Sequence, residues 1–119
     1  MKNEQKEFEG ILNLENVSTI DIHTKVWRDR VNGNSYGASR VVFNYGTESA
    51  LTLCVPFSYE YENTYFGLAR FLTDGEECCL HRVAQDHGIF VREYSEKARK
   101  RDAEAWGKGY DRIPLDYRH

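Results

Sequence analysis

Several groups of residues in this chain carry side chains that could bind a ligand or take part in chemistry. The first combines two cations with a large ring, and consists of Lys25, Trp27 and Arg40. A ring beside paired cations is typical of surfaces that stack a nucleobase and hold a phosphate. In the alternative interpretation, Asp21 or Asp29 neutralises the cations, and a second layer or another subunit covers Trp27.

Two further groups are basic. Arg28 and Arg30 stand close to Asn34 in the sequence and could form a site for an anion or an acidic partner, or could be ordinary surface residues. The run Lys97-Ala98-Arg99-Lys100-Arg101 is the main local concentration of positive charge. It could contact phosphates, or it could be one solvated face of a helix with acidic neighbours.

A fourth group, Cys78-Cys79 with His81 and His87, has the residue types of a zinc site. Its spacing lacks the paired Cys-x-x-Cys of structural zinc sites, and nothing in the sequence positions a base beside the thiols. The sequence also shows no P-loop, dinucleotide fingerprint, paired catalytic carboxylates or serine elbow. We therefore expect a protein that is not an enzyme and that needs no metal or cofactor.

The elements that must position these groups begin with a hairpin. Asn32-Gly33 lies between alternating apolar and polar residues, a pattern that predicts a two-residue type I′ turn. This turn would place Ile20 opposite Tyr45 and Lys25 opposite Arg40. Ile20 would then face the core, whereas the like charges of Lys25 and Arg40 would need an anion or a carboxylate between them. Tyr36 would lie on the same outer face as Trp27.

A third strand should follow over residues 51–57. A three-residue loop, Gly46-Thr47-Glu48, pairs Phe43 with Leu51 and keeps the apolar residues of both strands on one face. Pro56 should close this strand, because proline cannot donate a ladder hydrogen bond.

The second half of the chain predicts helices. The first runs from Asn63 or Thr64 to about Thr73 and carries one apolar stripe. We expect a second helix over residues 76–87 and a short strand over residues 89–91. A charged helix should follow, capped by Ser95 and ending near Trp106.

The whole chain of 119 residues is expected to form a single domain of the α+β class. We predict a three- to four-stranded, mostly antiparallel sheet, a β-meander, with helices packed on one face. Residues 1–9 should be flexible, residues 11–14 could add an edge strand, and residues 109–119 should form a docking tail. The net charge of −3 argues against a strongly basic nucleic-acid binder and against a heavily acidic DNA mimic.

The N-terminus is charged, and the chain lacks an apolar run long enough for a membrane span. With an odd number of cysteines, three, this indicates a cytoplasmic protein with reduced thiols. We also expect a homodimer. Trp27, Phe66, Phe71 and the aromatic tail together exceed what one small core readily covers, although the tail could instead fold back over Trp27.

Several segments resemble a family of small proteins encoded by bacteriophages and mobile elements. The most specific is Arg30-Val31-Asn32-Gly33-Asn34-Ser35-Tyr36, and residues 55–61 and 99–102 extend the resemblance. Small phage proteins without catalytic motifs often inhibit bacterial defence, as anti-CRISPR proteins or sponges for signalling nucleotides do. The resemblance thus implies a binding protein in the host cytoplasm, whose partner is a host defence protein or that protein's nucleotide or nucleic-acid ligand. The alternative is a nucleic-acid-binding accessory of phage recombination or replication.

Ten residues are the candidates for binding: Lys25, Trp27, Arg28, Arg30, Asn34, Tyr36, Arg40, Arg99, Lys100 and Arg101.

Overall fold

The computed structural model describes residues 14–59, 61–113 and 115. Within them, one sheet contains β1 (Thr19–Arg28), β2 (Ser35–Phe43), β3 (Leu51–Ser58) and β4 (Phe90–Lys97). The helices are α2 (Thr64–Leu72), α3 (Leu80–His87) and α4 (Lys100–Trp106), and the 3-10 turns η1 (Leu14–Asn16) and η2 (Tyr61–Asn63) precede β1 and α2. The predicted flexible segment 1–9, most of the predicted edge strand 11–14, and residues 114 and 116–119 of the tail lie outside the described residues.

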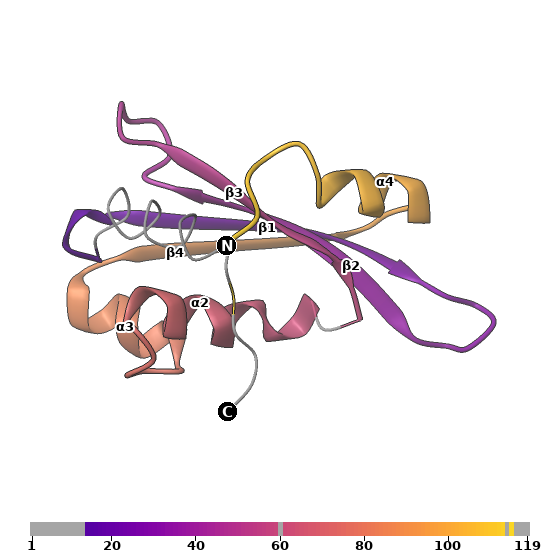
Figure 1. Cartoon of the computed structure of the whole chain (residues 1–119), viewed down its shortest axis with the longest axis horizontal. Coiled ribbons are helices and arrows are strands. Elements are labelled where there is room, and N and C mark those ends of the chain that lie inside the picture. The colour runs from indigo at the N-terminus through magenta and orange to yellow at the C-terminus, as the bar shows by residue number, and fades with distance from the viewer. Residues whose placement is uncertain (1–13, 60, 114, 116–119) are drawn as a thin grey trace.

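The strand order is β3-β2-β1-β4, and the α+β class is confirmed (Figure 1). Strands β1 to β3 form the antiparallel meander, whereas β4 pairs in parallel with β1. A parallel pair needs a crossover connection, and α2 and α3 provide it beneath one face of the sheet (Figure 1). Helix α4 lies on the opposite face, so the prediction that helices pack on one face has to be extended to two (Figure 1).

The turn between β1 and β2 is longer than predicted. Asp29 N–H donates to the Asn34 carbonyl and Gly33 N–H donates to the Asp29 carbonyl, each at 2.8 Å. The Asp29 carboxylate also accepts the N–H of Val31 at 2.8 Å. Gly33 adopts a φ of +76°, which glycine tolerates without strain. The two-residue type I′ turn is therefore wrong, because the side chain of Asp29 stabilises a wider loop.

The register of the hairpin moves with its turn. Ile20 lies opposite Phe43 and not opposite Tyr45. This shift of two residues is even, so every side chain keeps its predicted face of the sheet. The register between β2 and β3 is confirmed, with Phe43 opposite Leu51.

Pro56 does not close the third strand, since β3 continues to Ser58. Strand β3 is at the edge of the sheet, and its register with β2 shifts between Gly37 and Ser39. An edge strand at a bulge is where a sheet accepts proline.

The core lies between the sheet and the helices α2 and α3. Leu68 and Val83 from these helices meet the sheet residues Ile22 and Phe43, and all four side chains are buried. The predicted first helix is confirmed in position, as α2 spans Thr64–Leu72. No helix among the described residues is long and apolar enough to cross a membrane.

The last third of the chain differs most from prediction. Helix α3 starts at Leu80 and not at residue 76, although it ends as expected, with Gly88 at a φ of +65°. Strand β4 extends to Lys97, so Ser95 lies inside a strand and caps no helix. The pairs Arg92–Asp21 and His23–Glu96 join β4 to β1. Because these charged side chains have partners across the sheet, a strand forms from a sequence that suggests a helix.

Candidate nucleic-acid interface

Helix α4 is attached to the sheet at its C-terminal end. The indole N–H of Trp106 donates to the carbonyl of His23 at 2.8 Å. Ala103 is fully buried, and Gly107 lies so close to Ala38 and Phe57 that a side chain larger than hydrogen would collide with them. A thin apolar face is therefore sufficient for this charged helix, because a small residue and one indole make the contact.

Two cations of the outer sheet face contact the Trp106 ring. The Lys25 ammonium lies 4.3 Å and the Arg40 guanidinium 3.9 Å from the ring centroid. The predicted pair of Lys25 opposite Arg40 is wrong, because the two-residue shift places Lys25 opposite Ala38 and Arg40 opposite His23. An electron-rich ring next to both cations offsets part of their repulsion.

A row of rings lies on the same face, nearer the tip of the hairpin. The Tyr36 ring is 5.9 Å from Trp27, 5.8 Å from Phe57 and 5.6 Å from Tyr59, measured between centroids. The first three rings are partly exposed and Tyr59 is exposed. We call these four residues the ring platform. Partly exposed, adjacent rings offer surfaces on which planar groups can stack.

The basic run of the sequence reaches this platform. The Lys100 ammonium lies 5.2 Å from the centroid of Trp27. Arg99 and Arg101, on either side of Lys100, are exposed. Residues more than seventy positions apart in the chain therefore form one surface, a proximity for which the sequence gives no local signal.

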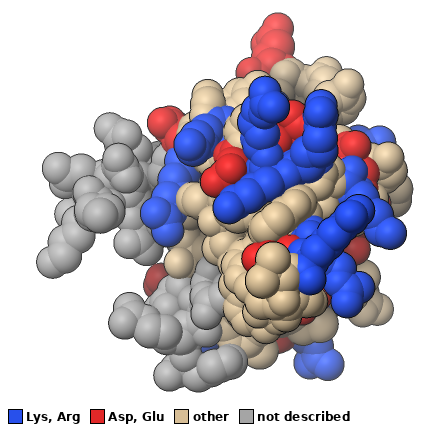
Figure 2. All heavy atoms as spheres, turned by 90° about the vertical axis from the view of Figure 1, so that its right-hand side faces the viewer, with Lys and Arg blue, Asp and Glu red and all other residues tan. Residues whose placement is uncertain are grey.

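The charges are distributed unevenly over the molecule. The hairpin tip, the end of β4 and the start of α4 lie at one end, which we call the basic end (Figure 1). Figure 2 shows Lys and Arg side chains gathered there. The exposed lysines and arginines of these three segments are Arg28, Arg30, Lys97, Arg99, Lys100 and Arg101. Four exposed acids lie at the other end of the molecule, in the β2–β3 turn, the loop after α2, and α3: Glu48, Asp74, Glu76 and Asp86 (Figure 1). The basic end also carries acids, Glu62 beside the hairpin tip and Asp102 next to Arg99.

The predicted site residues thus fall into separate places. Trp27, Tyr36 and Lys100 come together in or against the ring platform, whereas Lys25 and Arg40 come together at Trp106. The predicted grouping of Arg28, Arg30 and Asn34 is not formed. Asn34 and Ser35 line a hollow with Tyr61, Glu62 and Asn63, and neither arginine reaches it.

Three residues that complete these surfaces were not among the sequence candidates. Phe57 lies in β3 and Tyr59 follows the strand. The apolar alternation assigned Phe57 to the core face with Val55, but the register shift between Gly37 and Ser39 places it against Tyr36. Trp106 could be assigned to the outer face only once the start of α4 and the pairing of β4 were known. All three are ordinary aromatic residues, so their residue types alone did not mark them as part of these surfaces.

The cysteines and histidines form no metal centre among the described residues, where no group of three or more potential ligands is close enough. Cys54 is buried, and its thiol donates to the carbonyl of Gly107 at 3.1 Å. Cys78 and Cys79 are exposed, and His87 Nδ1 contacts the Val83 carbonyl at 3.1 Å.

The rings that suggested a dimer are partly covered within one chain. Helix α4 places Lys100 over Trp27, and Phe71 packs against the core. The segment after α4 pairs with β3, since Ile113 N–H donates to the Cys54 carbonyl at 2.9 Å.

Chemically, the outer face combines planar surfaces with cations, among which Lys100 and Arg101 are exposed and Arg99 has an exposed contact with Asp102. Rings can stack on nucleobases, and flexible lysine and arginine side chains can follow phosphates. Comparisons with protein-family models, with curated proteins and with solved structures found no match.

Proposed function

We propose that this protein is a non-enzymatic binding protein that takes single-stranded nucleic acid on its ring platform and basic end. The observation that supports this most directly is the position of Lys100 against Trp27. It brings the Arg99–Arg101 run beside a row of partly exposed rings. Separately, each feature is common on protein surfaces, whereas together they supply the stacking and the phosphate contacts that a single strand needs.

Single strands are favoured over duplexes for a geometric reason. The rings Trp27, Tyr36 and Phe57 stand next to one another at steps of 5.8–6.4 Å between centroids. They can stack only on bases that are not already stacked in a helix. The net charge of −3 adds no long-range attraction, so binding must depend on the basic end.

Fluorescence anisotropy with a labelled single-stranded oligonucleotide tests this proposal. At low salt we expect a dissociation constant on the order of micromolar, typical of a few phosphate contacts. Lys100→Gln should weaken binding and lower the slope of log K against log salt by about 0.7, the value for one contact on a single strand. Trp27→Leu should weaken binding with little change in slope, because it removes stacking and leaves the charges.

Arg82→Gln is the matched control. Arg82 is an exposed arginine on α3, away from the basic end, with only a 3.9 Å contact to Glu77. Its loss should leave affinity and salt slope unchanged. If Arg82→Gln and Lys100→Gln weaken binding equally, the attraction is general and the proposed site is wrong. The proposal also fails if the duplex form of the same oligonucleotide binds more tightly than the single strand.

The biological role that we propose for this binding is inhibition of a bacterial defence system, and it rests on the resemblance to phage proteins. Co-purification of the tagged protein from a bacterial host tests it. Capture of nucleic acid that Lys100→Gln reduces would agree with the proposed site. Stoichiometric capture of one host protein that Lys100→Gln and Trp27→Leu leave unchanged would favour a protein target elsewhere on the molecule.

A further inference from the structure

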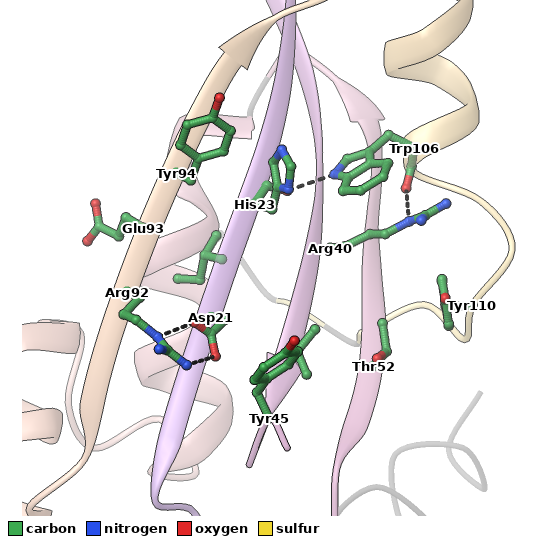
Figure 3. A pocket seen from close by; sticks show the side chains of 12 residues that line it. Asp21, His23, Arg40, Tyr45, Thr52, Arg92, Glu93, Tyr94, Trp106 and Tyr110 are labelled. Atoms are coloured by element: carbon green, nitrogen blue, oxygen red, sulfur yellow. Dashed lines mark hydrogen bonds and ion pairs between the residues drawn. The ribbon is translucent and has the colours of Figure 1, made fainter. Parts of the chain in front are cut away.

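A second candidate site lies on the outer face, at the C-terminal end of α4. It is a half-open cavity of about 570 Å³ (Figure 3). Four rings stand around it, from Tyr45, Tyr94, Trp106 and Tyr110. We call it the aromatic groove. It is separate from the ring platform, which is at the N-terminal end of the same helix, and an inference about it does not depend on the function proposed above.

Most charges at the groove are compensated. The carboxylate of Asp21 accepts two hydrogen bonds from Arg92, with Nη2 at 3.0 Å from Oδ2 (Figure 3). This contact also raises the pKa of Arg92, so the guanidinium keeps its charge. His23 Nε2 is paired with Glu96 at 2.5 Å. These pairs connect β1 to β4 beneath the groove. A further acid, Glu93, also lines the groove, and its carboxylate contacts the hydroxyl of Tyr65, so that burial and this contact together raise the pKa of Tyr65.

Arg40 is the cation of the groove that has no carboxylate partner among the described residues. Its Nε donates to the Trp106 carbonyl at 3.1 Å, and its Nη2 makes a longer contact to the Lys108 carbonyl at 3.5 Å. Its guanidinium is also held between the rings of Trp106 and Tyr110, at 3.9 and 4.9 Å from their centroids. Among the described residues no carboxylate pairs with Arg40. A guanidinium carries five N–H donors, so Arg40 retains donors and a whole positive charge for an anion.

The rings opposite Arg40 are available for a flat group. Tyr94 and Tyr45 are 60% and 66% exposed. The Tyr94 ring meets His23 edge to face at 4.8 Å, and His23 is itself fixed by Glu96. Tyr94 is therefore supported on one side by His23. Figure 3 shows Tyr94 and Arg40 on either side of His23, which lies opposite both of them in the sheet.

We propose that the aromatic groove binds a nucleoside monophosphate. The base stacks on Tyr94 and the phosphate accepts hydrogen bonds from Arg40. A ligand with a planar ring and an anionic group fits this groove, because the walls are aromatic and the anionic group can lie at Arg40, on the side of the groove away from Glu93. The volume of the cavity falls within the range of small-molecule sites, roughly 300–1,000 Å³.

Isothermal titration of the full chain with adenosine 5′-monophosphate, adenosine and inorganic phosphate tests this proposal. We expect the monophosphate to bind at least tenfold more tightly than adenosine or phosphate alone. Tyr94→Ala removes an exposed wall residue and should weaken monophosphate binding by tenfold or more. Arg40→Gln should reduce it at least as strongly, and Arg40→Lys should recover only part of the loss, because lysine has no planar fork.

Arg40 also holds the C-terminal end of α4, so Arg40→Gln must first be shown to unfold at a temperature close to that of the wild type. If it does not, Tyr94→Ala alone decides the question. Lys100→Gln is the matched control, since it should weaken oligonucleotide binding and leave monophosphate binding unchanged. This contrast separates failure of the groove from failure of the ring platform. Equal binding of phosphate and monophosphate, or monophosphate binding that Tyr94→Ala leaves unchanged, would overturn the proposal.

Discussion

The position of α4 on the sheet can be tested through one glycine, Gly107. This residue follows the last turn of α4 with a φ of −83°, a backbone conformation that alanine adopts without strain. A Cβ atom added here would lie 2.9 Å from the Phe57 nitrogen, 3.0 Å from the Ala38 Cβ and 3.0 Å from the Pro56 Cα. Two of these atoms are backbone, so no rotation of a side chain can relieve the collision.

The expected cost of Gly107→Ala follows from this geometry. Overpacking at a rigid contact costs about 1–3 kcal/mol in the free energy of unfolding. Movement of the helix end would also weaken the hydrogen bond from the Trp106 indole to the His23 carbonyl, worth about 0.5–1.5 kcal/mol. The total of about 1.5–4.5 kcal/mol corresponds to a fall in melting temperature of roughly 5–20 °C for a domain of this size.

Thermal unfolding followed by circular dichroism measures this fall. Gly109→Ala is the control, because Gly109 has a φ of +94° and no neighbouring atom within 4 Å of an added Cβ. It should cost only the backbone strain of about 1–2 kcal/mol. Gly107→Ala should also weaken oligonucleotide binding, since Lys100 would lose its position over Trp27, whereas Gly109→Ala should not. If Gly107→Ala melts at the temperature of the wild type, α4 does not contact the sheet as described.

Three further predictions concern other parts of the molecule. Burial and the neighbouring Glu93 raise the pKa of Tyr65 to about 12, so the folded protein holds this proton more tightly than the unfolded chain. The resulting stability is complete below about pH 10 and is lost as the pH rises through about 12, so the melting temperature of Tyr65→Phe should fall less steeply over that range than that of the wild type. The buried hydroxyls of Thr24 and Ser39 hydrogen-bond at 2.7 Å, so Ser39→Ala should cost about 1–3 kcal/mol in chemical denaturation, and adding Thr24→Val should cost less than the sum of the single changes. Finally, β4 is an edge strand of the described sheet, so we expect a homodimer in which two copies of β4 pair in antiparallel fashion. With the two-fold axis at Tyr94, Arg92 of each copy would face Glu96 of the other. A single sedimenting species near 13.9 kDa at micromolar concentration would exclude this dimer.

The hairpin shows how far local patterns predict this fold. The apolar alternation of β1 and β2 was sufficient to assign Ile22 to the core face and Trp27 to the outer face. The register was not predictable in the same way. Asn32-Gly33 favours a two-residue turn, but the carboxylate of Asp29 binds the N–H of Val31 and closes a wider loop. Such side-chain hydrogen bonds compete with standard turns and leave little trace in a hydrophobicity pattern.

The predicted site was incomplete because of a single non-local pairing. Ser95 before a charged segment is a reasonable helix cap. The segment is instead a strand that pairs with β1, and the contacts of Arg92 with Asp21 and of Glu96 with His23 support that pairing. Once β4 extends to Lys97, α4 must begin about one turn later than predicted, and Trp106 is then placed over Arg40. Lys25 and Arg40, whose like charges the hairpin alone does not explain, thus share Trp106 as an aromatic partner. They gain it because ion pairs join β4 to residues of β1 more than seventy positions away in the chain. In this sheet, the last strand along the chain, β4, sets where α4 begins and therefore which residues of the outer face lie against that helix.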